Sequence, residues 1–116
     1  MFQLPSLLQP IENEWTKKFN IQLFVKRDDL IHPEVSGNKW RKLKYNIKQA
    51  TLQQKNTLLT FGGAFSNHIT ATAAAGKYLG INTIGIIRGE EYDVLNPSLL
   101  FAKQCGMQLY YLNRTA

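Results

Sequence analysis

The second half of the sequence alternates short apolar runs with segments of helical character, and this alternation constrains the fold most. Three runs predict strands, at 57–63, 81–87 and 107–112. Two intervening segments predict helices, at 66–79 and 96–105. Such alternation favours parallel strands joined by right-handed crossovers. Because the strands show no clear polar alternation, we expect an α/β fold in which a parallel sheet has helices on both faces.

The first half of the sequence has a less regular pattern, but it also predicts both helices and strands. We expect a short helix over 11–19, a strand over 21–27, a loop over 28–37 and a helix from 38 to about 54. A chain of 116 residues suits one domain and cannot hold two full ones. We therefore expect one unit over 1–116, built from segment 1–56 and the strand–helix repeat over 57–112.

The charge and hydropathy of the chain limit the kinds of partner that it can bind. The chain carries 14 basic and 8 acidic residues, a net charge of +6, which would suit nucleic acid, a membrane surface or small anions. The basic face of the 38–54 helix has no interleaved aromatic residues, and no nucleic-acid reader motif is present, so we expect no nucleic-acid partner. No apolar stretch has the length of a membrane span and no signal peptide is visible, so we expect a soluble, cytoplasmic protein.

The sequence gives little support for a disulfide, a metal site or a pair of catalytic carboxylates. A single cysteine, Cys105, excludes an internal disulfide and a cysteine-based zinc site. His32 and His68 lie far apart in sequence, so we expect no metal site. Asp28 and Asp29 follow a predicted strand, and we interpret them as a turn and cap pair rather than as paired catalytic carboxylates.

Lys39 has an unusual position in the 38–54 helix. The core-facing arc of that helix, at 100° per residue, is formed by Trp40, Leu43, Ile47 and Ala50. Lys39 lies at the edge of this arc in the first turn, near the positive end of the helix dipole and one turn before Lys42. These surroundings favour the neutral amine that Schiff-base chemistry needs. The alternatives are that Lys39 merely lies over the core edge and that Lys42 holds an anion or is exposed.

The segment 61–68 joins a buried strand to a helix and is a second candidate site. Ligands of parallel α/β sheets bind at the carboxyl ends of strands, where free N–H groups at the next helix can hold carboxylate or phosphate. Ser66, Asn67 and His68 add polar side chains there, behind a glycine pair. The alternative is an ordinary turn with Ser66 as the helix cap. The segment matches neither dinucleotide-binding nor P-loop patterns.

Two motifs together resemble a known family. KRDDLIHPEVSGNKWRKLKY (26–45) and FGGAFSNHITATAAAGKYLG (61–80) are similar to the N-terminal part of the 1-aminocyclopropane-1-carboxylate deaminase and D-cysteine desulfhydrase family. The resemblance extends from Lys26 to the end of the chain. It implies a tryptophan synthase β-like fold (fold type II) and the cofactor pyridoxal 5′-phosphate.

The resemblance also implies residue roles. Lys39 would carry the cofactor covalently, and Lys42 would approach its phosphate. Asn67 would bind the 3′ oxygen of the pyridine ring and face the substrate. Ser66 would hold the substrate carboxylate and assist proton transfer, and His68 would line the substrate pocket.

The implied reactions convert D-cysteine to pyruvate, sulfide and ammonia, or 1-aminocyclopropane-1-carboxylate to 2-oxobutanoate and ammonia. The triplet ending in His68 is more similar to desulfhydrase-type members. Because members carry a second large segment with the phosphate-binding loop, we expect this chain to be truncated and weakly active or inactive alone. Full-length members are expected to form homodimers with a small amino acid as substrate. The alternative function is a non-catalytic α/β module that binds a small anion or a protein partner.

Overall fold

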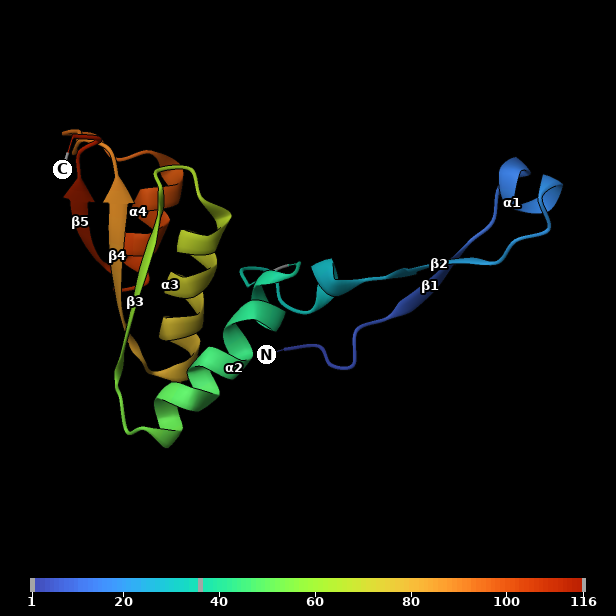
Figure 1. Cartoon of the computed structure of the whole chain (residues 1–116), viewed down its shortest axis with the longest axis horizontal. Helices are drawn as coiled ribbons and strands as arrows, with labels where there is room; N and C mark the ends of the chain where they lie inside the picture. Colours follow the sequence, from blue (N-terminus) through green and yellow to red (C-terminus); the bar gives the residue numbers. More distant parts are fainter. Residues whose placement is uncertain (1, 36, 116) are drawn as a thin grey trace.

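The computed structural model describes residues 2–35 and 37–115, which form an extended arm and a layered α/β part (Figure 1). The arm contains β1 (Leu8–Ile11), α1 (Glu14–Lys18) and β2 (Leu23–Lys26). A 3-10 turn at Asp28–Leu30 leads into the α/β part, which comprises α2 (Lys39–Leu52), β3 (Thr57–Gly63), α3 (Asn67–Leu79), β4 (Asn82–Arg88), α4 (Pro97–Gln104) and β5 (Gln108–Leu112). The arm gives the molecule its long axis of 54 Å, against 34 and 23 Å in the other directions.

The three strands of the α/β part form the predicted parallel sheet, in the order β3-β4-β5. In this register Phe61 pairs with Ile86, and Ile86 with Tyr110. The connecting helices have the expected ends. Asn96 caps α4 by accepting from the N–H of Leu99 at 2.9 Å, and Gly80 ends α3 in the left-handed conformation, at φ 69°.

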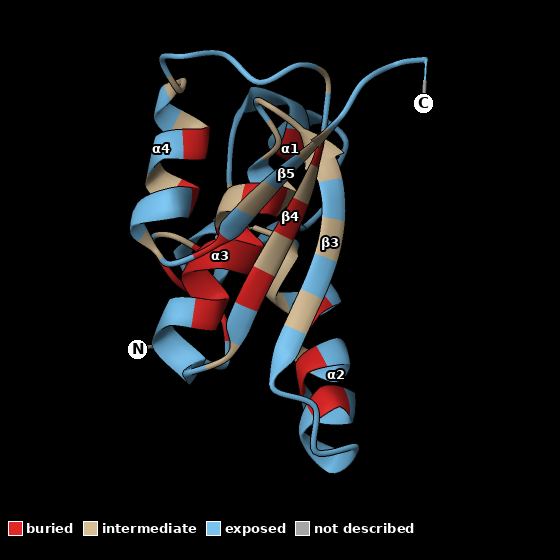
Figure 2. Cartoon of the chain, turned by 90° about the vertical axis from the view of Figure 1, so that its left-hand side faces the viewer, coloured by how far each residue is buried: buried red, intermediate tan, exposed pale blue. Residues whose placement is uncertain are grey.

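Within the described residues, helices cover one face of the sheet, and the expected coverage of both faces is not found (Figure 2). On β4, Thr83 and Ile87 point toward the helices and are 3% and 1% exposed. Phe61 and Tyr110 on the opposite face remain exposed. The reason is geometric. Both crossovers step in the same direction along the sheet, and crossovers of one hand that do so place their helices on the same side.

Helix α3 is the centre of the packing. Its alanines at 71, 73, 74 and 75 are all buried. On one side they pack with a cluster from α2 and the preceding loop, formed by Val35, Leu43 and Ile47. On the other side they pack with a cluster from the sheet and α4, formed by Ile87, Leu99, Ala102 and Met107. The predicted core face of α2 is thereby confirmed for its buried members.

The arm differs from the sequence-based expectation. The predicted helix over 11–19 is shorter, and a strand, β1, precedes it. β1 pairs antiparallel with β2, with Pro10 opposite Phe24. Pro10 indicated a break in the sequence, but both strands of a two-stranded ladder are edges, where a residue without an N–H is tolerated. Asn13 and Thr16 begin α1 with reciprocal capping bonds of 3.0 Å.

Gly76 gives a test of the close packing of α3 against β4. A Cβ at this position would lie 2.5 Å from Thr83 Cγ2 and 2.7 Å from the carbonyl oxygen of Ile81. Alanine is favoured over glycine in a helix by about 1 kcal/mol, but overpacking against a backbone carbonyl outweighs this preference. Gly76→Ala should lower the free energy of unfolding in urea by about 1–3 kcal/mol.

The matched control is Gly63→Ala. The nearest atom to its added Cβ would be the flexible Arg88 Nη2, at 4.0 Å. This variant should change the free energy of unfolding by less than about 0.5 kcal/mol. Equal stability of the two variants would contradict the packing described for α3.

Candidate functional site

The loop that precedes α2 is held in place by His32. Its ring is 2% exposed and packs edge-on against Tyr78 of α3. The Nδ1 atom accepts hydrogen bonds from the N–H groups of Glu34 at 3.0 Å and Val35 at 3.2 Å. Burial lowers the pKa of His32, which favours the neutral ring that can accept these bonds. His32 therefore fixes this loop as far as Val35.

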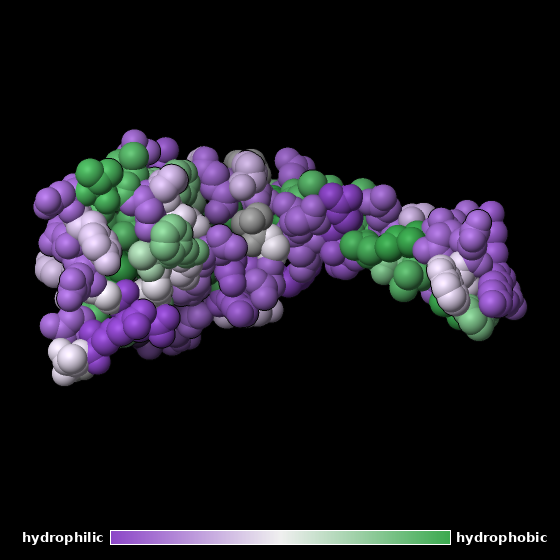
Figure 3. Space-filling model, turned by 90° about the horizontal axis from the view of Figure 1, so that it is seen from above, coloured by the Kyte–Doolittle hydropathy of each residue, from purple (hydrophilic) through white to green (hydrophobic). Residues whose placement is uncertain are grey.

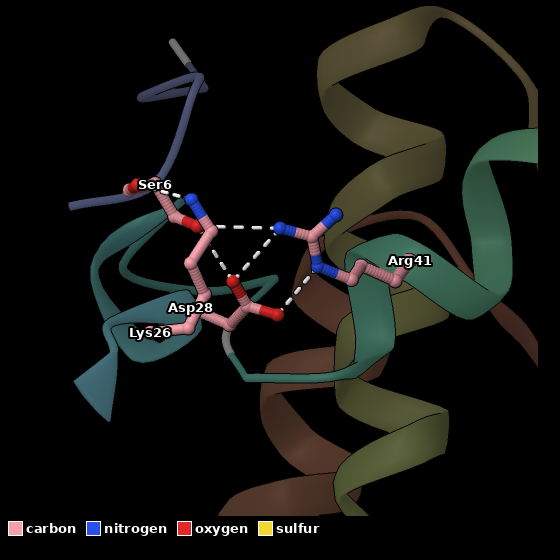
Figure 4. A network of polar contacts seen from close by, with 4 residues as sticks. All are labelled: Ser6, Lys26, Asp28 and Arg41. Atoms are coloured by element: carbon pink, nitrogen blue, oxygen red, sulfur yellow. Dashed lines mark hydrogen bonds and ion pairs between the residues drawn. The ribbon is translucent and has the colours of Figure 1, made fainter. Parts of the chain in front are cut away.

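A polar network ties the arm to the first turn of α2 (Figure 4). Arg41 donates through Nε and Nη2 to both carboxylate oxygens of Asp28. Ser6 Oγ donates to the same carboxylate at 2.7 Å, and Lys26 Nζ donates to the Ser6 carbonyl at 2.6 Å. The hydrogen bonds from Arg41, and then from Ser6, lower the pKa of Asp28 to about 2. Asp28 is thus more than the turn residue expected from sequence, because it fixes the helix turn that carries Lys39.

Ser66 begins α3 at the carboxyl end of β3. Its Oγ accepts from the N–H groups of His68 at 3.2 Å and Ile69 at 3.4 Å. A Cβ at Gly62 would lie 3.2 Å from this Oγ and 2.6 Å from Ile69 Cγ1. The absence of a side chain at Gly62 therefore allows Ser66 and Ile69 to lie close to the end of β3. Since Ser66 Oγ accepts both bonds, its own proton stays available to a ligand.

His68 points back toward strand β3. Its Nε2 lies 2.7 Å from Thr60 Oγ1, which fixes the orientation of the ring. Burial lowers the pKa of His68, and the positive charges of Lys39 and Lys42 lower it further. The ring is therefore neutral at neutral pH. Thr60 is a neighbour that the sequence analysis missed, and the only signal for it is its inward position on β3.

Lys39 and Asn67 line one cavity of about 570 Å³. The starts of α2, α3 and α4 meet around it, and its other walls include Gly37, Asn38, Thr70, Pro97 and Ser98. Glu34, which sequence reasoning did not single out, also lines it, and its Oε2 atom is buried without a hydrogen-bond partner among the described residues. The cavity thus combines a primary amine, an amide and an unsatisfied carboxylate oxygen.

The other predicted site residues, Lys42, Ser66 and His68, are not part of the lining of this cavity. Lys42 is exposed, one turn further along α2. Ser66 lines a neighbouring cavity on the other side of the β3–α3 loop. The structure therefore brings Lys39 and Asn67 together and places Ser66 apart from them.

Residues 2–35 and 37–115 lack two other kinds of feature. No three histidine, cysteine or acidic side chains in these ranges group closely enough to hold a metal ion. No helix in the same ranges has the length and apolar character needed to cross a membrane.

Comparison with known proteins finds relatives named as 1-aminocyclopropane-1-carboxylate deaminases and as D-cysteine desulfhydrases. The chain is 37% identical over 98 residues to the bifunctional D-cysteine desulfhydrase/1-aminocyclopropane-1-carboxylate deaminase, mitochondrial, of Arabidopsis thaliana, which covers 80% of this chain. It is 35% identical over 66 residues to the D-cysteine desulfhydrase of Salmonella paratyphi B, covering 57% of this chain. A crystal structure of a 1-aminocyclopropane-1-carboxylate deaminase homologue matches 96% of the chain with a TM-score of 0.75 and 29% identity.

The chain is much shorter than these proteins. It spans 24% of the Arabidopsis relative, 20% of the Salmonella relative and 33% of the crystallised homologue. No sequence-family profile matches it. The matches therefore cover only part of the length of each of these proteins.

Asp28→Asn tests the network that holds α2. The lowered pKa of Asp28 means that its ion pair stabilises the folded state above the ordinary value of 3.8, and that this stabilisation is lost as pH falls through about 2. In urea unfolding, Asp28→Asn should be less stable than the parent chain at neutral pH, and the difference should disappear below about pH 2. The control is Asp29→Asn, whose more exposed pair with Arg27 should contribute less. A difference that persists at low pH would contradict the assignment.

His68 can be tested by NMR titration of the imidazole protons. Removing a neighbouring positive charge favours the imidazolium form, so Lys42→Ala should raise the pKa of His68. The internal control is His32, whose pKa is lowered first by burial and should not move. Equal pKa shifts at both histidines in Lys42→Ala would refute the local electrostatic effect.

In the parent chain, the lowered pKa of His68 should make the folded state less stable as pH falls below 6.5, because the unfolded ring then binds more protons than the folded one.

Proposed function

We propose that this chain, which is similar to 1-aminocyclopropane-1-carboxylate deaminases and D-cysteine desulfhydrases, belongs to that family and forms one side of a pyridoxal 5′-phosphate site. The observation that carries the proposal is the shared cavity of Lys39 and Asn67. Those two residues come from separate motifs, 26–45 and 61–80, and the fold places them at one opening.

The donor set of the cavity fits this cofactor. An aldehyde needs a primary amine, which Lys39 supplies from a half-buried position. A ring oxygen needs a hydrogen-bond donor, which the Asn67 amide supplies. Lys42, exposed at the next turn, supplies positive charge for the phosphate. The bound group would supply an electron sink that stabilises negative charge at the substrate Cα.

The other residues would handle the substrate. Ser66 has one hydroxyl proton free to donate to a carboxylate, since its oxygen already accepts from the start of α3. His68 is neutral near pH 7 and is oriented by Thr60, so it would line the pocket without adding charge. Lys39 is the one basic side chain among the described residues that line the cavity, and it would hold or accept a proton beside Asn67.

The substrate class is a small amino acid. We propose a lyase or deaminase reaction that converts D-cysteine and water to pyruvate, hydrogen sulfide and ammonia, or 1-aminocyclopropane-1-carboxylate and water to 2-oxobutanoate and ammonia. The histidine at position 68 is our reason to place D-cysteine first. Because the chain spans about a quarter of the Arabidopsis relative's length, we propose weak cofactor binding and little turnover by these residues alone.

Covalent trapping tests the proposed site directly. The purified chain is mixed with pyridoxal 5′-phosphate, reduced with borohydride and digested, and the labelled lysine is identified by mass spectrometry. We expect selective labelling of Lys39, loss of that label in Lys39→Ala, and weaker labelling in Lys42→Ala.

The control is Lys48→Ala, which removes an exposed lysine from the same helix and should leave labelling unchanged. Labelling that is spread evenly over the lysines, or that survives Lys39→Ala at the same level, would refute the assignment of Lys39.

A further inference from the structure

Strand β5 is one edge of the parallel sheet, and no strand of the described residues lies on its outer side (Figure 2). The N–H of Gly89 donates to the carbonyl of Leu112 at 2.8 Å, so the backbone groups of Leu112 point toward β4. Because the direction of these groups alternates along a strand, those of Leu109 and Tyr111 point away from β4. Within the described residues, no hydrogen bond outside the β4–β5 ladder reaches them. The outer side of β5 therefore offers free donors and acceptors.

This edge lacks the features that usually prevent strand pairing. Native sheets protect their edges with lysine, proline or a bulge, whereas β5 has the uncharged sequence QLYYL. The opposite edge, β3, ends in Gly62 and Gly63, which weaken a strand. Next to the free edge, Tyr110 and Leu112 on the uncovered face of the sheet are 55% and 46% exposed. Apolar side chains also gather at this end of the molecule, away from the arm (Figure 3).

A groove of about 590 Å³ runs beside the same edge. One wall is formed by residues 107–111, and the other includes the loop at 91–93. The charged residues in its lining are Glu91, Asp93 and Lys103, so the groove has a net charge of −1. The segment 107–114 has Arg114 as its one charged residue and therefore a net charge of +1. A second copy of this segment is thus complementary in charge to the groove.

We propose that a second copy of this chain occupies this edge, with the β5 strands of the two copies paired antiparallel about a two-fold axis. Such a contact is closed, because it uses the same surface of both copies. The register centred on Tyr110 is the one that pairs all five residues of β5. In this register Leu109 faces Tyr111 of the second copy, and their outward groups exchange hydrogen bonds. The two three-stranded sheets then form one sheet of six strands.

The side chains suit this register. Tyr110 lies on the axis opposite Tyr110 of the second copy, as a non-hydrogen-bonded pair with Cα atoms about 4.5 Å apart. An aromatic pair at such a position stabilises a sheet. Gln108 faces Leu112 of the second copy, so no like charges lie opposite each other. Because one strand pair is a small interface, we expect a weak dimer whose population depends on concentration.

The first test is sedimentation equilibrium of the whole chain over a wide range of concentrations, together with amide hydrogen exchange by NMR. We expect a monomer–dimer equilibrium. The amides of Leu109 and Tyr111 should exchange more slowly at concentrations where the dimer predominates, while exchange in β3 should not change. A monomer at every concentration, or a dimer without added protection at these two amides, would overturn the proposal.

Charged variants at Tyr110 test the register. Tyr110→Lys and Tyr110→Glu each place like charges opposite each other on the axis, so each should weaken the dimer about tenfold. An equimolar mixture of the two should form a one-to-one dimer about as tightly as the parent, because position 110 faces its own copy. Recovery in the mixture would also show that both variants fold. A mixture that associates no better than the separate variants would overturn the register.

The matched control is Phe61→Lys, which places the same charge on the same face of the sheet, at a side chain that is 65% exposed on β3. It should dimerise as the parent does. Loss of the dimer in Phe61→Lys but not in Tyr110→Lys would show that the copies pack face to face, and would overturn the proposal.

This inference goes beyond the proposed function and can fail separately from it. Tyr110 does not line the Lys39 cavity, so Tyr110→Lys should keep the pyridoxal label of the parent chain. A chain that dimerises through β5 without selective labelling of Lys39 would refute the cofactor site and support the strand pairing.

Discussion

Helix α3 contacts the sheet, α2 and α4 at once, and it can do so because its buried side chains are small. Alanines at 71, 73, 74 and 75 let neighbouring elements approach closely on two sides. Both candidate cavities lie at the amino-terminal end of this helix. The position of α3 therefore determines where the lysine motif, the serine–asparagine motif and the β4–α4 loop meet.

Polar contacts then orient what the apolar core brings together. Asp28 and Arg41 connect the arm to the turn that carries Lys39, and His32 holds the loop before it. These contacts join residues that are distant in sequence. The apolar clusters determine which helices and strands are neighbours, while the hydrogen bonds orient the segments that carry the site residues. Asn96 does the same for the β3–α3 loop.

Most helices and strands of the α/β part could be predicted from local pattern. The cap at Asn96, the stop at Gly80 and the apolar run at 57–63 depend on interactions within a few residues. β1 could not be predicted in this way, because it exists through pairing with β2 and contains a proline. The uncovered face of the sheet could not be predicted either, since apolar strands have similar sequences whether helices cover one face of the sheet or both.

Candidate residues show the same division. The sequence by itself determined that Lys39 begins a helix at the edge of an apolar face and that Ser66 caps another, because both depend on helical periodicity and on the needs of a helix terminus. Only the tertiary structure decided that Lys39 and Asn67 share a cavity and that Ser66 lines a different one. These are distances between elements, and they result from how α3 packs against its neighbours, which no local pattern encodes.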